Sequence, residues 1–328
     1  MRGILPKLHH QTLGRNPSMS HYARFSRNGK QFLALTGHTM EEFQALLPSF
    51  RTCFLKRMEH YTLKGKKRGK RCYRDYCNSP LPTIEDKLVF ILMYLRKATT
   101  QDIFGEVFKM PQPVANKWIH ILHPCLNRAL AELGEKPARS IVELHLAPEK
   151  GQIFFQDGTE RPIQRPKNQE IQGLFYSGKK KRHCIKNNVL VNQQAKICLL
   201  TPTCEGKKHD KKIADETNLV LPKGSSLCQD TGFQGYALSG VTMIQPMKKP
   251  RGKELTPEQK ESNRQISRLR IRVEHAIAGV KRYRIVKDQV RARKDNFQDR
   301  VMETCCGLHN FRLNFRPWRY KSDSVKVL

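Results

Sequence analysis

The apolar positions in the first half of the chain repeat at helical spacing. Thr39 and Glu42 have the spacing of a capping box, and the apolar residues after them predict a short helix. Residues 1–38 are polar and basic, which predicts a loosely held arm. Further along, the periodicity predicts three helices within about residues 83–130, the last two separated by a sharp turn at Met110–Pro113.

Three short helices with a tight connection between the last two have the outline of a helix-turn-helix. The third helix would present Gln112, Asn116 and Lys117 near its start, where a recognition helix meets base edges. Pro124 predicts a kink or an early end to this helix. An ordinary three-helix packing unit has the same pattern, but the basic surroundings favour DNA binding. Residues 39–134 are therefore expected to form an all-α DNA-binding region.

After a linker at residues 135–150, which is expected to hold a short helix, the pattern changes to that of strands. The expected elements are a strand, a hairpin of two strands, a helix and two further strands: Gly151–Phe155, His183–Val191, Lys196–Thr201, a helix from His209, Ser226–Cys228 and Val241–Pro246. This order predicts an α/β fold, with a ribonuclease-H-like core over residues 151–316 and a tail at 317–328. The first and fourth strands of such a core are neighbours.

An aspartate follows each of these two strands. Asp157 comes after the first strand and Asp230 after the fourth, so the two carboxylates are expected to lie side by side. Neighbouring carboxylates repel one another unless cations neutralise them. The pattern therefore predicts a site for divalent metal ions.

A long helix is expected from Thr256, which is followed by Pro at the first helical position and Gln at the third. Glu274 lies in its centre, with Arg270 and Lys281 before and after it. At about 100° per residue, these three side chains project within about 60° of one another. A metal-binding acid flanked by phosphate-binding cations fits this face, although a plain salt-bridged helix also predicts an Arg270–Glu274 pair.

The charge balance indicates the class of partner. The 328 residues include 61 Lys and Arg against 29 Asp and Glu, a net charge of +32. Nucleic acid is the expected partner, because each phosphate neutralised by Lys or Arg releases condensed counterions. The run Lys64–Arg71 is expected to be a solvated loop that contacts phosphate. A basic ribosomal or chromatin protein is the alternative, but it would not need paired strand-end carboxylates.

The ten cysteines show no Cys-x-x-Cys spacing, so they predict no zinc site. The start of the chain has no signal-like apolar segment, and no run approaches the roughly 18 apolar residues of a membrane span. We therefore expect an intracellular protein without a membrane partner, in the nucleoid or cytoplasm of a bacterium or the nucleus of a eukaryote.

Several strings of residues resemble DDE superfamily transposases, in particular the Harbinger-like branch and related bacterial insertion-sequence transposases. They are Asp157–Glu160, Tyr176–His183, His209-Asp210, Asp230–Gly235 and Arg270–His275. The likeness is strong over about residues 150–315 and looser over the helix-turn-helix region. It implies a catalytic triad of Asp157, Asp230 and Glu274.

The chain departs from this family at two positions. The family tends to carry a Tyr–Arg–Glu–Lys signature on its last catalytic helix; Arg270, Glu274 and Lys281 match it, but Ser267 stands at the Tyr position. Phe233 stands where relatives often have Tyr, which keeps the ring and loses the hydroxyl. Neither departure changes an expected metal ligand.

The resemblance also implies the chemistry. Two Mg²⁺ or Mn²⁺ ions per active site, about 3.5–4 Å apart, would activate the attacking oxygen and stabilise the leaving oxygen. The substrates would be double-stranded DNA, both terminal repeats and target, and two synapsed ends require at least a homodimer. Besides Arg270 and Lys281, the cations expected to contact DNA are Lys179, Lys180, Lys181 and Arg182.

Asp210 is a second candidate for the middle acid. It follows His209 at a helix start, where it could instead be an N-cap or an outer-shell group. Asp230 is preferred because it ends a strand next to Asp157. Two related functions stay open: a domesticated DNA-binding protein without cleavage, and a non-transposing nuclease of the same fold.

Overall fold

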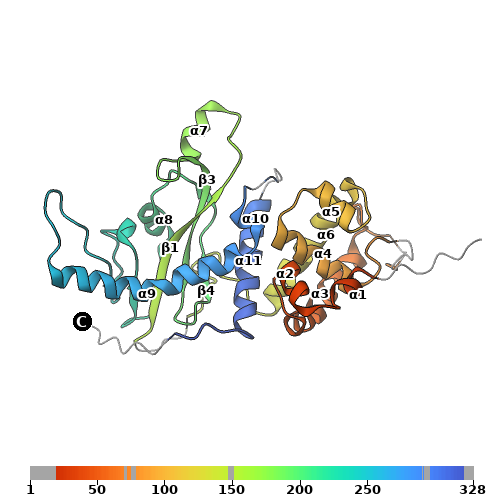
Figure 1. Cartoon of the computed structure of the whole chain (residues 1–328), viewed down its shortest axis with the longest axis horizontal. Helices are drawn as coiled ribbons and strands as arrows, with labels where there is room; N and C mark the ends of the chain where they lie inside the picture. Colours follow the sequence, from red (N-terminus) through yellow and green to blue (C-terminus); the bar gives the residue numbers. More distant parts are fainter. Residues whose placement is uncertain are drawn as a thin grey trace, which may run out of the picture.

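The computed structural model describes residues 20–320, apart from 70–71, 75–78, 147–150, 290 and 292–295. A helical part at residues 20–132 is followed by an α/β part at residues 151–313 (Figure 1). The helices of the helical part are α1 (His21–Phe25), α2 (Gly29–Thr36), α3 (Met40–His60), α4 (Ile84–Lys97), α5 (Gln101–Val107) and α6 (Gln112–Glu132).

The α/β part contains strands and helices in alternation. Its strands are β1 (Ile153–Pro162), β2 (Tyr176–Ser177), β3 (Arg182–Val191), β4 (Ile197–Leu200), β5 (Cys204–Glu205), β6 (Ser226–Cys228) and β7 (Thr242–Ile244). Its helices are α7 (Gln169–Phe175), α8 (Asp210–Thr217), the 3-10 helix η1 (Thr231–Phe233), α9 (Pro257–Lys281), α10 (Arg284–Lys287) and α11 (Phe297–Leu313). Among the described residues, no helix is both long and apolar enough to cross a membrane.

Two long antiparallel strands, β1 and β3, form the centre of the sheet. The outer edge of β3 pairs in turn with β2, β5 and β4. On the other side of β1, β6 and then β7 run parallel to it. The order β4–β3–β1–β6–β7 brings β1 and β6 together, so the expected neighbour relationship of the first and fourth strands is confirmed.

Apolar residues cover both faces of the sheet. On one face, Phe154, Leu190 and Leu227 pack with α8 and the segment after β6. On the other face, Phe155 and Val189 belong to a larger core that continues through α9 and α11 into the helical part. Burial of this shared apolar surface joins the helical part to the α/β part. The helix α11 lies at the junction and contacts α6, α9 and β4 (Figure 1).

The sequence correctly predicts how α3 and α9 begin. Thr39 and Glu42 form a capping box at the start of α3. Thr256 and Gln259 do the same at the start of α9, with Pro257 at the first helical position. However, α3 is 21 residues long rather than short and continues through Pro48.

Several local predictions were wrong. Residues 20–38 do not form a loose arm, because Phe25 and Phe32 anchor α1 and α2 in the core; residues 1–19 lie outside the described part. The helix does not end early at Pro124, because α6 continues to Glu132. The described residues of the expected linker, 135–146, contain turns and a bridge to β4 rather than a helix. The helix α7 was not predicted.

Candidate active site

Asp157 lies in the middle of β1, where one neighbouring strand ends. The pairing of β1 with β6 runs from Ile153 to Phe155, whereas its pairing with β3 continues to Pro162. The sequence placed Asp157 after the strand, but the strand continues past it. Beyond Phe155, the edge of β1 that faced β6 is no longer covered by a strand, so Asp157 has access to the surface there while its backbone is held by β3.

Asp230 lies beside Asp157. Phe155 is paired with Cys228, and each aspartate follows two residues after its member of that pair. The intervening residues keep the strands together, since Gln229 Nε2 donates to Gln156 Oε1 at 2.6 Å. The Asp230 carboxylate accepts a hydrogen bond from Gly232 N and caps η1, which fixes it at this position.

The electrostatic state of Asp157 reflects this proximity. Burial raises the pKa of Asp157 to about 6, and the negative charges of Asp230 and Asp210 add to the rise, against the opposing effect of Arg270. Arg270 Nη2 lies 3.5 Å from Asp157 Oδ2. The charge of Arg270 therefore does not fully offset the effects of burial and of the neighbouring aspartates on Asp157.

The helix α9 brings Glu274 to the same side of the sheet. Its residues Arg270 and Lys281 both act on Asp157, the first by direct contact and the second through its charge. Glu274 lies between them on the same helix face, since residues four and seven apart share a face. Its side chain is exposed and, among the described residues, forms no ion pair. The Arg270–Glu274 pair of a plain salt-bridged helix is therefore not formed, and Arg270 pairs with Asp157 instead.

The three acids do not form a closed cluster. In the described part of the chain, no three His, Cys, Asp or Glu side chains are close enough together to form a ready-made metal site. Asp157 and Asp230 are adjacent, while Glu274 is placed on the facing helix with its carboxylate in solvent.

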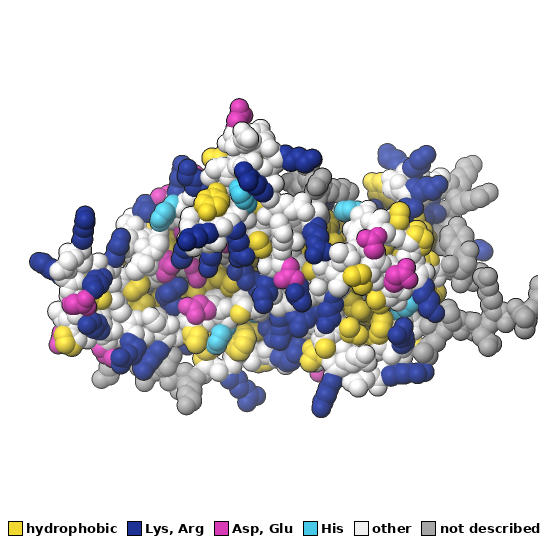
Figure 2. Space-filling model, turned by 45° about the horizontal axis from the view of Figure 1, so that its top comes forward, with side chains coloured by type: hydrophobic (Ala, Val, Ile, Leu, Met, Phe, Trp, Pro, Cys, Tyr) yellow, Lys and Arg dark blue, Asp and Glu magenta, His cyan; other side chains and the backbone are white. Residues whose placement is uncertain are grey.

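Cations surround these acids. Burial lowers the pKa of Lys281, as does the charge of Lys180, while Asp157 and Glu160 oppose the shift. Lys180 belongs to the exposed turn between β2 and β3 that also carries Lys179, Lys181 and Arg182. Figure 2 shows acidic side chains gathered at one place on the α/β part, with Lys and Arg side chains around them. Such a surface can hold an anionic polymer next to the acids.

Residues 156–310 match the protein family described as DDE superfamily endonuclease. Over this stretch the chain is similar to the DDE superfamily. It is also 29% identical over 252 residues to the probable transposase for insertion sequence element IS702 of Microchaete diplosiphon, in an alignment that covers 76% of this chain and 85% of that protein. No solved structure matches the chain. The matched range includes Asp157, Asp230 and Glu274.

The sequence did not predict a charge network in the α/β part, formed by Glu160, Lys186 and Asp210. Lys186 Nζ lies 3.1 Å from Asp210 Oδ1 and 3.5 Å from Glu160 Oε1. Glu160 and Lys186 are direct partners in the β1–β3 ladder, so their side chains share one face of the sheet. Lys186 could have been noticed as a lysine inside the expected strand His183–Val191, but only the register identifies its partners.

Asp210 is not an N-cap. His209 is the N-cap residue of α8 and makes no capping hydrogen bond through its side chain, whereas Asp210 is the first helical residue. Its carboxylate contacts Lys186, and its negative charge contributes to the raised pKa of Asp157. The cap interpretation is therefore wrong.

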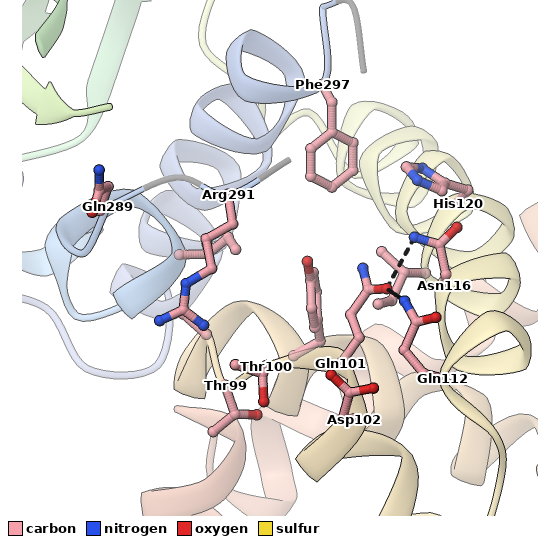
Figure 3. A pocket seen from close by; sticks show the side chains of 14 residues that line it. Thr99, Thr100, Gln101, Asp102, Gln112, Asn116, His120, Gln289, Arg291 and Phe297 are labelled. Atoms are coloured by element: carbon pink, nitrogen blue, oxygen red, sulfur yellow. Dashed lines mark hydrogen bonds between the residues drawn. The ribbon is translucent and has the colours of Figure 1, made fainter. Parts of the chain in front are cut away.

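Two of the three expected base-reading residues, Gln112 and Asn116, line a separate hollow. This hollow has a volume of about 450 Å³ and lies between α4–α6 and the start of α11 (Figure 3). Gln112 Nε2 and Asn116 Nδ2 both donate to Gln101 Oε1, at 2.5 and 3.0 Å, so these amides are engaged within the chain. Lys117 is exposed and does not line the hollow.

Proposed function

We propose that the chain is a DNA transposase that cleaves the ends of its element and joins them to target DNA. The observation that carries the proposal is the pair Asp157, on β1, and Asp230, just after the adjacent strand β6, with Arg270 and Lys281 of α9 acting on Asp157 and Glu274 on the same face of that helix. The strand order supports a ribonuclease-H-like core. The match to DDE superfamily endonucleases and the similarity to an insertion-sequence transposase support the reaction class.

The donor set suits hard divalent cations. Carboxylate oxygens are the ligands that Mg²⁺ and Mn²⁺ prefer, and the raised pKa of Asp157 beside two further aspartates marks a site where a cation would relieve repulsion. Asp157 and Asp230 would hold two such ions, with Glu274 as the third ligand. When bound, the ions supply Lewis-acid activation of the attacking oxygen and stabilisation of the leaving oxygen.

The chain's own residues position the DNA. Lys281, together with the turn Lys179–Arg182, provides positive charge beside the acids and would bind the phosphates that flank the scissile bond. Arg270 would hold Asp157 in place through their ion pair and, once cations neutralise the carboxylate, becomes available to a phosphate. Asp230 stays fixed by its bond from Gly232 N, which keeps one ligand preorganised.

The helical part would recognise the terminal repeats. The helices α5 and α6 follow one another through a short turn, as in a helix-turn-helix, and Lys117 is exposed near the start of α6. Gln112 and Asn116 would have to exchange their bonds to Gln101 for bonds to DNA. Because two element ends are processed together, the active assembly on DNA would be at least a homodimer.

Incubation of the purified full chain with a labelled element-end duplex and Mg²⁺ tests this function. Nicking at the element end supports the transposase. Cutting without regard to the end supports a non-transposing nuclease of the same fold, and binding without cutting supports a domesticated DNA-binding protein. A duplex of scrambled end sequence is the control that separates the first two outcomes.

A further inference from the structure

The carboxylate of Asp210 lies directly over two glycines that adjoin the proposed metal ligands. A Cβ atom on Gly158, the residue after Asp157, would lie 2.5 Å from Asp210 Oδ1. A Cβ on Gly232, whose amide binds Asp230, would lie 3.6 Å from Asp210 Oδ2. The Asp210 carboxylate therefore lies close to both Gly158, next to Asp157, and Gly232, next but one to Asp230. It has room there because residue 158 has no side chain.

Asp210 is held in this place by its neighbours in the sheet. Asn188, which pairs with Gly158 in the β1–β3 ladder, donates from Nδ2 to the main-chain oxygen of Asp210 at 2.9 Å. Lys186 Nζ approaches the carboxylate to 3.1 Å, and the Lys186 side chain is only 9% exposed. These contacts fix both the start of α8 and the direction of the Asp210 side chain.

Ion pairs within the chain do not neutralise all of the acidic side chains around Asp210. Among the described residues, Asp157 pairs with Arg270, Glu160 and Asp210 share Lys186, and Asp230 forms no ion pair, so four carboxylates contact only two cations. Lys186 is shared between Glu160 and Asp210, so one of these two acids is always incompletely neutralised. Buried like charges are costly unless a cation is added.

A second observation points to a ligand at the same place. The Asn188 side chain is fully buried, and its Oδ1 has no hydrogen-bond partner in the described part of the chain. Leaving a buried amide oxygen without a donor costs about 1–3 kcal/mol. Because Asn188 Nδ2 donates to the main-chain oxygen of Asp210, the unpaired Oδ1 of the same amide lies close to Asp210. A hydrated cation offers the missing donor.

We propose that Asp210 is a fourth carboxylate of the divalent-metal site, beside Asp157, Asp230 and Glu274. The inference rests on the proposed function. It assigns Lys186 the role of holding Asp210 toward the site when no metal is bound, and it makes Gly158 necessary for the approach of this carboxylate to the β1 backbone.

The binding of Mn²⁺ to the full chain without DNA, measured by titration calorimetry, tests the proposal. We expect D210N to weaken Mn²⁺ binding by about tenfold or more, the range seen when a group supporting a metal site is removed. The matched control is D215N, because Asp215 lies on the same helix and pairs with Lys211, away from the acids. D215N should bind Mn²⁺ as the unaltered chain does.

Unchanged Mn²⁺ affinity of D210N, with binding by the unaltered chain intact, would overturn this proposal alone. Absence of Mn²⁺ binding by the unaltered chain would overturn the metal-dependent function as well. Thermal melting without metal checks that D210N is folded; D210S, which removes the carboxylate with a smaller side chain, is measured in the same way and must show the same loss.

Discussion

Arg270 of α9 is paired with Asp157 of β1, with Nη2 and Oδ2 3.5 Å apart. This contact ties the helix that carries Glu274 to the strand that carries the first acid. It also places a cation where a DNA phosphate and a metal ion would compete with it. The pair therefore connects the proposed DNA-binding face of α9 with the acids of the sheet.

We expect R270Q to reduce the salt dependence of DNA binding. If Arg270 contacts one phosphate, the slope of log affinity against log salt falls by about one. Fluorescence anisotropy of a labelled element-end duplex over a series of NaCl concentrations measures it. R264Q is the control, because Arg264 lies on the same helix but pairs with Glu261 on an exposed surface. An unchanged slope in R270Q would confine Arg270 to its pair with Asp157.

Replacement of Lys186 by Met should destabilise the fold. The change leaves Glu160 and Asp210 without their shared cation in a largely buried place, which costs about 2–3 kcal/mol after allowance for their partial exposure. Urea unfolding in EDTA measures the loss. Mg²⁺ should restore part of it in K186M, because a bound dication offsets the same two charges. Equal loss with and without Mg²⁺ would separate Lys186 from the metal site.

Gly158→Ala should displace Asp210. The new Cβ would lie 2.5 Å from Asp210 Oδ1, so the carboxylate must move away from the β1 backbone. We expect DNA cleavage to fall at least tenfold with a modest loss of about 1–3 kcal/mol in stability. Gly178→Ala is the control, since nothing lies within 4 Å of its added Cβ. Cleavage by Gly158→Ala at the rate of this control would show that the close approach is dispensable.

Buried histidines predict loss of stability in acid. Burial lowers the pKa of both His123 and His309 to about 3, and each ring bonds to a buried neighbour. Their unfolded pKa is about 6.5, so the unfolded chain takes up protons first as pH falls. The free energy of unfolding should therefore be unaffected by them above about pH 6.5 and should fall between about pH 6.5 and 3.

Urea unfolding at pH 7.5, 6.0 and 5.0 measures this effect. Each histidine contributes up to about 1.4 kcal/mol per pH unit within that window. H123Q should therefore be less stable at pH 7.5 but should show a shallower decline than the unaltered chain. A decline as steep in H123Q as in the unaltered chain would mean that His123 does not remain neutral in the folded state.

The sequence predicts the start of α9 and the position of β6 better than it predicts the extent of β1. Strand β6 could be predicted because a short apolar run ends at Asp230, and α9 because Thr256 and Gln259 form a capping box. The full length of β1 could not, because Gly158 to Pro162 has no apolar alternation; pairing with β3 keeps this stretch extended. Tertiary pairing, rather than local pattern, decides it.

The Glu160–Lys186–Asp210 network shows the same limit. Glu160 and Lys186 meet only because of the antiparallel register, and Asp210 joins them from a helix on the same face. No spacing within the chain contains that information. Likewise, α1 and α2 lie in a polar stretch of the sequence, and a few apolar residues, such as Phe25 and Phe32, anchor them in the core.

Cleavage of a labelled element-end duplex by E274Q in Mg²⁺ tests the central claim most directly, because Glu274 is the acid that lies exposed on the facing helix. The matched control is E261Q, an exposed glutamate on the same helix that pairs with Arg264. We predict that E274Q loses cleavage by about a thousandfold, as when a member of a catalytic unit is removed, while DNA affinity is retained and E261Q stays active. Cleavage by E274Q at the rate of E261Q would contradict the account.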